Sequence, residues 1–327
     1  MTTKFNLIQK IYPDLKEDPP IWYKRLQCRP PHGYINGVLF VLLAIAGVLG
    51  MLAGSIWDLP VDQFLYHPEA LWASTFAFIG PLPAFWALGT ASLLLLQASK
   101  EKHFPWSVSV SISVIALAIS IYKCVDLMSK VCSLSTWVMA VISLLAVYLP
   151  SWLLFTFLRG KIQPETLVYF AFFLLAVVLL ETVLITLIKD VRGRPRYYFL
   201  ISESKAEFEP WYLFGSVQKE TLSALLSPDK DVFRSFPSGH TGSSACILAF
   251  CAIPLLTNRK VSLTPVLSAS LIWIVLTAIS RLVLGMHFIS DVSAGFLIGL
   301  AAFAICYWFF FSRFKSRHPE RTCSCQQ

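Results

Sequence analysis

Long apolar runs, separated by short polar connections, dominate the sequence from residue 35 to residue 311. Each run is about as long as the roughly 20 residues that an α-helix needs to cross the hydrocarbon core of a bilayer. We expect about eight transmembrane helices, near residues 35–57, 71–97, 106–127, 134–158, 165–188, 240–257, 264–286 and 290–311. Pro81 and Pro83 lie inside the second run, so a break or kink is expected there. The pattern therefore predicts an all-α, polytopic membrane helix bundle.

The composition agrees with a membrane environment. Hydrophobic residues make up 56% of the 327 residues and charged residues only 14%, which is too apolar for a soluble domain of this length. The aromatic share of 14% is typical of belts of Trp and Tyr at the two lipid interfaces. The net charge of +8 then indicates membrane topology and attraction to anionic headgroups, so we expect the lipid bilayer as a partner and no nucleic acid.

Lys and Arg in short connections mark the cytoplasmic side of a membrane protein. With the N-terminus inside, every alternate connection and the C-terminal tail carry basic residues: Lys100 and Lys102, Arg159 and Lys161, Arg259 and Lys260, and Arg313, Lys315, Arg317 and Arg321. The first opposite connection, from Trp57 to Ala70, instead contains Asp58, Asp62 and Glu69. Both termini are therefore predicted to be cytoplasmic.

The long connection 189–237 breaks this pattern. It is external by parity, yet it contains the basic residues Lys189, Arg192, Arg194, Arg196, Lys205, Lys219, Lys230 and Arg234. Cations that the topology does not explain, at the mouth of a helix bundle, indicate a site for an anion. We divide the chain into a cytoplasmic segment 1–34, N-terminal transmembrane helices 35–160, a core 161–312 that includes this external loop, and a basic cytoplasmic tail 313–327.

Three segments bring residues that handle phosphate to the same external face. The first, Lys189 to Tyr197, is rich in Arg, which by itself is common at a membrane edge. The second, Phe236 to Thr241, leads into the sixth run, so the free N–H groups of that helix can face an anion. Ser238 can cap the helix and donate to a phosphate oxygen, Gly239 allows close approach, and His240 follows in the first turn. A Ser N-cap is also an ordinary structural feature.

The third segment, Ser280 to Asp291, joins the last two helices. His287 and Asp291 are four residues apart, so in a helix the carboxylate can accept an N–H of the imidazole. Such a bond fixes the tautomer and leaves the other ring nitrogen as a nucleophile. Arg281 would add a bidentate fork for phosphate oxygens. Taken singly, Arg281 also fits a residue that snorkels to the interface, and the His–Asp pair fits an ordinary helix end.

In order and spacing the three segments resemble the type 2 phosphatidic acid phosphatase superfamily, whose signature is K-x6-R-P, then P-S-G-H, then S-R-x5-H-x3-D. The second and third elements match completely. The first element departs from the signature, because the family spacing from Lys189 leads to Arg196, which is followed by Tyr197 and not by proline. Arg194 is followed by Pro195 but at the wrong spacing. Both arginines stay candidates, with Arg196 preferred.

The resemblance, which spans residues 180 to 310, implies a phosphatase that works through a phosphohistidine intermediate. His287 would attack phosphorus, Asp291 would orient His287, and His240 would protonate the leaving oxygen. The residues that would bind the phosphoryl oxygens are Lys189, Arg196 or Arg194, Ser238, Gly239 and Arg281. These cations would do the work of a metal ion, so neither a metal nor another cofactor is expected.

A site at the lipid–water boundary favours a membrane-associated substrate. The motif surroundings look most like those of bacterial phosphatases of phosphatidylglycerophosphate and undecaprenyl pyrophosphate. We therefore expect a multi-pass membrane hydrolase of lipid phosphate monoesters, such as phosphatidic acid, or pyrophosphates, with its site on the periplasmic, extracellular or lumenal side. The alternatives are a phosphotransferase to a lipid or sugar acceptor, a phosphatase of soluble monoesters, and a lipid-phosphate binder or transporter without turnover. The exact lipid, the role of residues 1–160 and a pairing of Cys124 with Cys132 stay open.

Overall fold

The computed structural model describes residues 37–162, 164–213, 215–226, 229–257 and 262–312. All regular structure in this part of the chain is helical, which confirms the predicted all-α bundle. Eight helical segments are long and apolar enough to span a bilayer: Gly37–Leu65, Leu71–Lys100, Trp106–Ser129, Thr136–Leu158, Thr166–Ser202, Gly239–Leu256, Leu263–Val283 and Ile289–Phe311. The predicted segment 1–34, the tail 313–327, Arg259 and Lys260 lie outside the described residues. The orientation of the termini stays a prediction.

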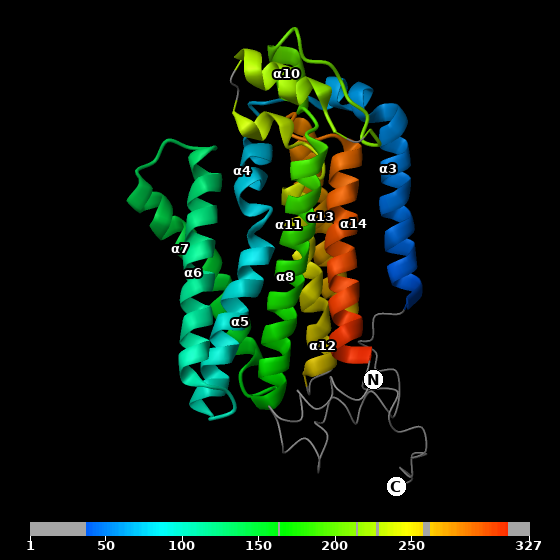
Figure 1. Ribbon diagram of the computed structural model, residues 1–327. Helices are drawn as coiled ribbons and strands as arrows, with labels where there is room; N and C mark the ends of the chain where they lie inside the picture. The colour runs from blue at the N-terminus through cyan, green and yellow to red at the C-terminus, as the bar shows by residue number, and fades with distance from the viewer. Residues whose placement is uncertain (1–36, 163, 214, 227–228, 258–261, 313–327) are drawn as a thin grey trace.

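Figure 1 shows the helices in their order along the chain. They are α3 (Gly37–Leu65), α4 (Leu71–Ile79), α5 (Leu82–Lys100), α6 (Trp106–Ser129), α7 (Thr136–Leu158), α8 (Pro164–Arg192), α9 (Tyr197–Ser202), α10 (Val217–Leu226), α11 (Gly239–Ala245), α12 (Ile253–Leu256), α13 (Leu263–Val283) and α14 (Ile289–Tyr307). Two 3-10 helices, η2 (Lys230–Phe233) and η3 (Cys246–Ala252), and a π-helical turn, η4 (Trp308–Ser312), complete the set. The sixth span is therefore built from three consecutive pieces, α11, η3 and α12.

The loop between α8 and α11, which contains α9 and α10, covers one end of the bundle, and the described chain begins and ends at the opposite end (Figure 1). Main-chain hydrogen bonds join three segments under this loop: Arg196 N–H donates to the Val232 carbonyl, and Ser238 N–H donates to the Asp291 carbonyl, both at 2.9 Å. The three segments that the sequence selected for phosphate binding therefore converge at one end of the bundle.

The second span is broken at the position where its two prolines predict a break. Gly80 and Pro81 separate α4 from α5. Because Pro81 has no N–H, the carbonyl four residues earlier, that of Ala77, has no helical donor. The neighbouring Gly80 carbonyl is also open and accepts a hydrogen bond from Trp273 Nε1 of α13 at 3.0 Å. The break therefore exposes main-chain acceptors inside the bundle.

The first helix is longer than predicted. α3 continues past Pro60, so Asp58 and Asp62, which were expected in an external loop, lie inside the helix and are buried. Of the three acidic residues expected in that loop, only Glu69 lies exposed in the following connection. The expectation was wrong because carboxylates at the end of an apolar run usually face water, whereas Asp58 forms a buried ion pair with Arg194.

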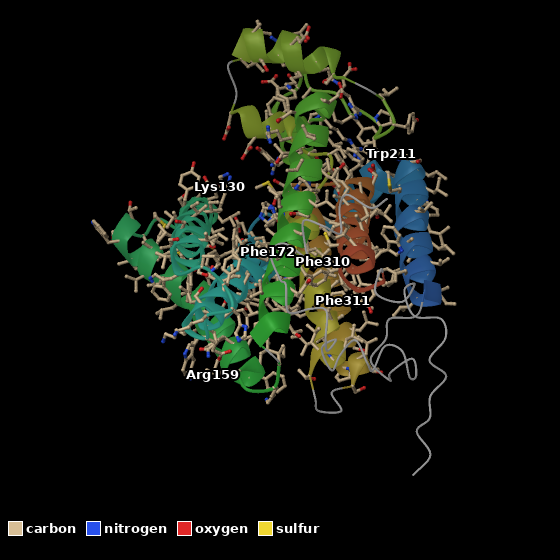
Figure 2. The ribbon with its side chains drawn as sticks, turned by 60° about the horizontal axis from the view of Figure 1, so that its bottom comes forward. Lys130, Arg159, Phe172, Trp211, Phe310 and Phe311 are labelled. Atoms are coloured by element: carbon tan, nitrogen blue, oxygen red, sulfur yellow. The ribbon has the colours of Figure 1, made fainter. Side chains whose placement is uncertain are left out.

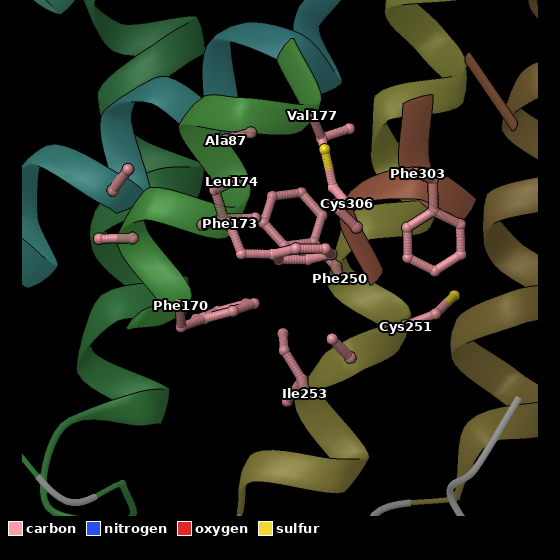
Figure 3. Close-up of a cluster of buried hydrophobic side chains, with 14 of the residues drawn as sticks. Ala87, Phe170, Phe173, Leu174, Val177, Phe250, Cys251, Ile253, Phe303 and Cys306 are labelled. Carbon is pink, nitrogen blue, oxygen red and sulfur yellow. The ribbon is translucent and has the colours of Figure 1, made fainter. Parts of the chain in front are cut away.

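The main core cluster lies between α8, η3 and α14 (Figure 3). Phe173 of α8 packs edge-on against Phe303 of α14, with the ring centroids 6.2 Å apart. Because lipid tails are as apolar as this core, the cluster stabilises the bundle mainly through close packing. The cluster occupies the half of these helices that is remote from the loop between α8 and α11, so the polar contacts described next are concentrated at the loop end.

Cys124 and Cys132, which were left open as a pair, are both free thiols. Cys124 is buried in a small cluster with Leu82 and Val147. Cys132 is half-buried and donates to the Met128 carbonyl at 3.4 Å. Local packing, and no disulfide, therefore accounts for the two side chains in this structure.

Candidate active site

A tight turn after α13 delivers His287 to the end of the bundle. Gly285 has a φ of +62°, its N–H donates to the Leu282 carbonyl at 2.8 Å, and Met286 N–H donates to the Arg281 carbonyl at 3.0 Å. This pair of bonds is a Schellman motif, which requires a left-handed residue that glycine adopts without steric cost. The chain therefore reverses sharply and places His287 between α13 and α14.

Asp291 lies in the first turn of α14, and its buried carboxylate is held by three donors. Oδ2 accepts hydrogen bonds from Phe288 N–H at 2.9 Å and from the Ser235 hydroxyl at 2.5 Å. Oδ1 accepts from Nη1 of Arg194 at 2.5 Å. A carboxylate at this position also interacts favourably with the positive end of the helix dipole. The position of Asp291 is thus determined without a bond to His287.

The tautomer of His287 is fixed by the main chain. Its Nδ1 lies 2.6 Å from the Ser235 carbonyl oxygen, which can only accept, so Nδ1 carries the proton and Nε2 keeps its lone pair. Asp291 Oδ2 lies 3.7 Å from Nδ1, which is close enough for an ion pair but too long for the hydrogen bond that the spacing predicted. The carboxylate is already engaged by other donors, and the carbonyl before α11 lies closer to the ring.

The surroundings of His287 favour its neutral form. Burial lowers the pKa of His287 to about 3; Asp291 opposes this shift, and the positive charges of Lys189 and Arg196 add to it. A neutral imidazole that keeps a lone pair on Nε2 is the form that can attack an electrophile.

The segment before α11 caps this helix, as predicted. Ser238 is the N-cap residue, and its hydroxyl accepts a hydrogen bond from the Thr241 N–H. Gly239 lies beside Lys189, because a Cβ at Gly239 would be 3.6 Å from the Lys189 Cε atom. The free N–H groups at the start of α11 therefore lie next to a lysine side chain, an arrangement that favours an anion.

His240 is half-buried in the first turn of α11 and is held by the broken span. Its Nε2 lies 3.1 Å from the Ala77 carbonyl, the carbonyl that Pro81 leaves without a helical donor. The bond requires a proton on Nε2, so Nδ1 is the nitrogen that can exchange a proton with another molecule.

Three predicted cations surround the two histidines. Lys189 and Arg196 each donate to a main-chain carbonyl at 2.7 Å. Arg281 is buried, and its Nε and Nη1 have no hydrogen-bond partner within the described residues. All three act electrostatically on His240. Burying a guanidinium whose N–H donors have no acceptor costs free energy, and a bound anion supplies the missing acceptors. This cluster therefore favours binding of an anion.

Arg194, the alternative to Arg196, is engaged differently. Every nitrogen of its buried guanidinium donates to a protein acceptor, including the carboxylates of Asp58 and Asp291. Arg196, in contrast, forms no ion pair with a carboxylate in the described part of the chain, and its Nη1 contacts the weak acceptor Met286 Sδ at 3.1 Å. The geometry thus leaves Arg196, and not Arg194, with capacity for a further anion.

Hydrogen bonds and a ring contact hold the loop between α8 and α11 against the helices that carry the site. Arg192 at the end of α8 donates to the carbonyls of Trp211 and Gly215 at 3.2 and 3.1 Å. Trp211 stacks on Phe236 and donates from Nε1 to the Ser55 hydroxyl of α3 at 2.9 Å. Figure 2 shows Trp211 beside the end of α3. The loop therefore connects α8 with α3 above Arg194.

Sequence reasoning missed three contributors: Asp58, Ser235 and the Ala77 carbonyl. A carboxylate near the end of an apolar run was a usable signal for Asp58, since ionisable groups within membrane spans usually have partners. Pro81 was a usable signal for a free carbonyl at Ala77. Ser235 holds the ring through its main chain, for which the sequence contains no side-chain signal.

Comparison with known proteins identifies the region that contains the site. The profile of the PAP2 superfamily matches residues 166–315. The chain is similar to this superfamily over residues 166–315, which are called the PAP2 domain below. Every site residue selected from the sequence lies inside this PAP2 domain, whereas Asp58 and Ala77 lie outside the matched range.

Curated relatives of the protein include three phosphatases. A probable diacylglycerol pyrophosphate phosphatase 1 of Schizosaccharomyces pombe is 32% identical over 51% of this chain and 62% of its own length. Phosphatidylglycerophosphatase B of Escherichia coli (strain K12) is 37% identical over 33% of this chain and 38% of its own. The protein of that name from Bacillus subtilis is 38% identical over 21% and 36%. The alignments thus span 36 to 62% of these relatives' lengths, and no solved structure matches the chain.

Proposed function

We propose that this protein is an integral-membrane phosphatase that hydrolyses lipid phosphate monoesters or pyrophosphates through a phosphohistidine intermediate. The observation that carries the proposal is the buried Arg281 guanidinium, at the same bundle end as a neutral His287 with a lone pair on Nε2. Among the described residues, Nε and Nη1 of Arg281 have no hydrogen-bond partner. A cation with unused donors at the same bundle end as a nucleophile favours a ligand that is both an anion and an electrophile, and a phosphoryl group is both.

In the first step Nε2 of His287 attacks phosphorus, so that a P–N bond forms and the bond from phosphorus to the leaving oxygen breaks. Nδ1 keeps its proton and donates it in a hydrogen bond to the Ser235 carbonyl. Asp291 Oδ2, 3.7 Å from Nδ1, stabilises the positive charge that the ring acquires. His240 gives a proton to the leaving oxygen. Because Nε2 of His240 is bound to the Ala77 carbonyl, Nδ1 delivers that proton.

In the second step water attacks phosphorus, the P–N bond breaks, and His240 takes a proton from the water. Inorganic phosphate leaves, and His287 returns to its neutral form. Lys189, Arg196 and Arg281 stabilise the charge on the phosphoryl oxygens in both steps, so the proposal assigns no metal. Arg196 is assigned this role in place of Arg194, because the Arg194 donors are already engaged.

The substrate in this proposal is a lipid. The site lies where α8, α11, α13 and α14 end or begin. The ends of membrane-spanning helices lie at the level of the lipid headgroups, which supports a lipid substrate. The names of the relatives point to phosphatidylglycerophosphate and diacylglycerol pyrophosphate, and phosphatidic acid and undecaprenyl pyrophosphate share the same phosphoryl chemistry. The distribution of Lys and Arg supports cytoplasmic termini and a site on the periplasmic, extracellular or lumenal face.

The test is phosphate release by the detergent-purified protein from these four lipids and from glucose 6-phosphate, with EDTA present. His287→Ala is compared with His67→Ala, which removes an exposed histidine from the connection between α3 and α4. The wild type and His67→Ala should release phosphate from at least one lipid. His287→Ala should be slower by at least about 10³-fold, because it lacks the nucleophile.

Two outcomes would contradict the proposal. Release that persists in His287→Ala would exclude the phosphohistidine, and the absence of release from every substrate would exclude phosphatase activity on this panel. Product analysis with added lipid or sugar acceptors separates hydrolysis from phosphoryl transfer, since a transferase yields a phosphorylated acceptor in place of inorganic phosphate.

A further inference from the structure

Asp58 of α3 forms a buried bridge between the N-terminal helices and the PAP2 domain. Its side chain is 1% exposed. Oδ2 accepts a hydrogen bond from Nη2 of Arg194 at 2.9 Å and another from the Ser290 hydroxyl. Oδ1 accepts from the Ser290 N–H at 2.9 Å. Asp58 therefore holds both an arginine and the first turn of α14, in which Asp291 follows directly.

Arg194 transmits this contact to Asp291. Its Nη1 lies 2.5 Å from Asp291 Oδ1, and its Nε donates to the Glu209 carbonyl at 2.7 Å. The guanidinium also lies over the Phe288 ring, 4.2 Å from its centroid. Because these contacts hold it from several directions, Arg194 cannot reorient without breaking buried hydrogen bonds. It is thus shared between two carboxylates, one from α3 and one from α14.

The charge of Asp58 determines how strongly Asp291 can act on His287. One guanidinium between two carboxylates leaves this group of three side chains with a net negative charge. The oxygen of the group that lies near the imidazole is Asp291 Oδ2, 3.7 Å from Nδ1 of His287. Without Asp58, the whole positive charge of Arg194 would offset Asp291. The positive charge that His287 acquires during attack would then be stabilised less.

The packing of α3 keeps Asp58 in place. Gly47, Gly50 and Gly54 lie on the face of α3 that contacts α14. A Cβ at Gly54 would lie 2.7 Å from the Ser290 nitrogen, so only glycine allows this approach. Much of the remaining surface of α3 is exposed, which makes this glycine face and Asp58 its main attachment to the PAP2 domain.

We infer that Asp58 is a positioning residue for the reaction: acting through Arg194, it keeps Asp291 directed at His287. This inference rests on the proposed function, and it extends the active site into a helix outside the PAP2 match. Asp58 contacts none of the three cations assigned to phosphate, so it should affect the chemical step and leave phosphate binding unchanged.

The experiment measures kcat, KM and competitive inhibition by inorganic phosphate for the full-length protein with the lipid that the wild type hydrolyses. Asp58→Asn should lower kcat by about 10- to 100-fold, the usual cost of removing a group that orients an active-site residue. KM and the inhibition constant of phosphate should stay within about twofold of the wild type, since the anion site is intact. Loss of packing alone would not lower kcat while leaving KM and the inhibition constant of phosphate unchanged.

Asp62→Asn is the matched control. Asp62 lies one turn further along the same face of α3 and is equally buried, but neither of its oxygens has a hydrogen-bond partner in the described chain. The substitution therefore breaks no contact, and its kcat should equal that of the wild type. A similar fall in kcat for both variants would show that any carboxylate in α3 suffices and would overturn the inference.

A double-mutant cycle tests the route through Arg194. In an Arg194→Gln background, Asp58→Asn should lower kcat by less than about threefold, because the residue through which it acts is gone. The double variant removes both members of the Asp58–Arg194 ion pair, so neither of these two charges is left buried without the other. If Asp58→Asn alone does not fold, the comparison of Arg194→Gln with the double variant still tests the inference. Equal effects of Asp58→Asn in the two backgrounds, or an unchanged kcat in Asp58→Asn, would overturn the inference. A wild type that releases no phosphate would instead contradict the proposed function.

Discussion

His287 lies in a region held by charge, whereas His240 lies in a region held by one main-chain hydrogen bond. Around His287, the carboxylates of Asp58 and Asp291 share Arg194, and all of these side chains are buried. His240 is half-buried, and its ring is held by the Ala77 carbonyl at 3.1 Å. The difference agrees with the proposed roles, because a nucleophile must keep one tautomer and acquire charge, whereas a general acid must exchange protons with substrate and water.

The largest effect that would separate the two regions comes from changing the leaving group in His240→Ala. With phosphatidic acid, whose alcohol must be protonated as it leaves, kcat should fall by about 10² to 10⁴-fold. With p-nitrophenyl phosphate, whose leaving group departs without a proton, the variant should release a rapid burst of about one equivalent of nitrophenol. Rapid-mixing absorbance measures the burst. Equal losses with both substrates would contradict the role of general acid.

An intermediate effect concerns the charge around His287. Lys189→Ala removes a positive charge that disfavours protonation of the ring, so the pKa of His287 should rise from about 3 by about one unit. A pH titration of the His287 Cε1 signal by NMR, in protein labelled at histidine, measures this value. Lys205→Ala is the control, because Lys205 is an exposed lysine of the same loop and should leave the titration unchanged.

The same titration tests whether the wild-type His287 ring is neutral. In the wild type the His287 ring should stay neutral from pH 8 down to about pH 4, because burial and the nearby cations favour the uncharged form. An acid limb of kcat/KM near pH 6 would then belong to the second ionisation of the substrate phosphate, whose pKa is about 6. A His287 signal that titrates near its ordinary value of 6.5 would contradict this assignment.

The smallest effect tests the main-chain bond to His240. Pro81→Ala restores an N–H that can close the helix onto the Ala77 carbonyl and so compete with the His240 ring. We expect kcat to fall by about two- to fivefold, since one hydrogen bond in a half-buried position contributes about 1 kcal/mol. Pro83→Ala is the control, because it restores an N–H two residues past Pro81 that can donate to the carbonyl of Ile79 and not to that of Ala77. A kcat equal to that of the control would show that the Ala77 carbonyl does not orient His240 for catalysis.

Much of the candidate site could be predicted from the sequence, because the residues proposed to contact phosphate are near one another in sequence or occur in short motifs. Ser238 as a cap and His240 in the first turn follow from local helix rules, and the structure has this cap. The expected bond from Asp291 to His287 was wrong although the spacing was right. A spacing of four shows that two side chains share a helix face, but it does not show which acceptor lies nearest.

The contacts that orient the histidines could not be read in the same way. Asp58 and Arg194 are 136 residues apart, and Ala77 and His240 are 163 residues apart. Both Asp58 and Ala77 belong to helices that the family signature does not cover. Their roles depend on how the N-terminal helices pack against the PAP2 domain, which no local pattern of residues reports.

The sequence by itself determined that the chain has about eight runs long and apolar enough to cross a membrane, where the second of them breaks, and which residues are candidates to bind and attack a phosphoryl group. These properties follow from the lengths of apolar runs, the missing N–H of proline and the chemistry of side chains, all of which are local. Only the tertiary structure decided that Arg194 pairs with Asp58 of α3 as well as with Asp291, and that the Ser235 carbonyl fixes the tautomer of His287. The physical reason is that buried charges and carbonyls take the partner that packing brings within about 3 Å, and packing joins residues far apart in the chain.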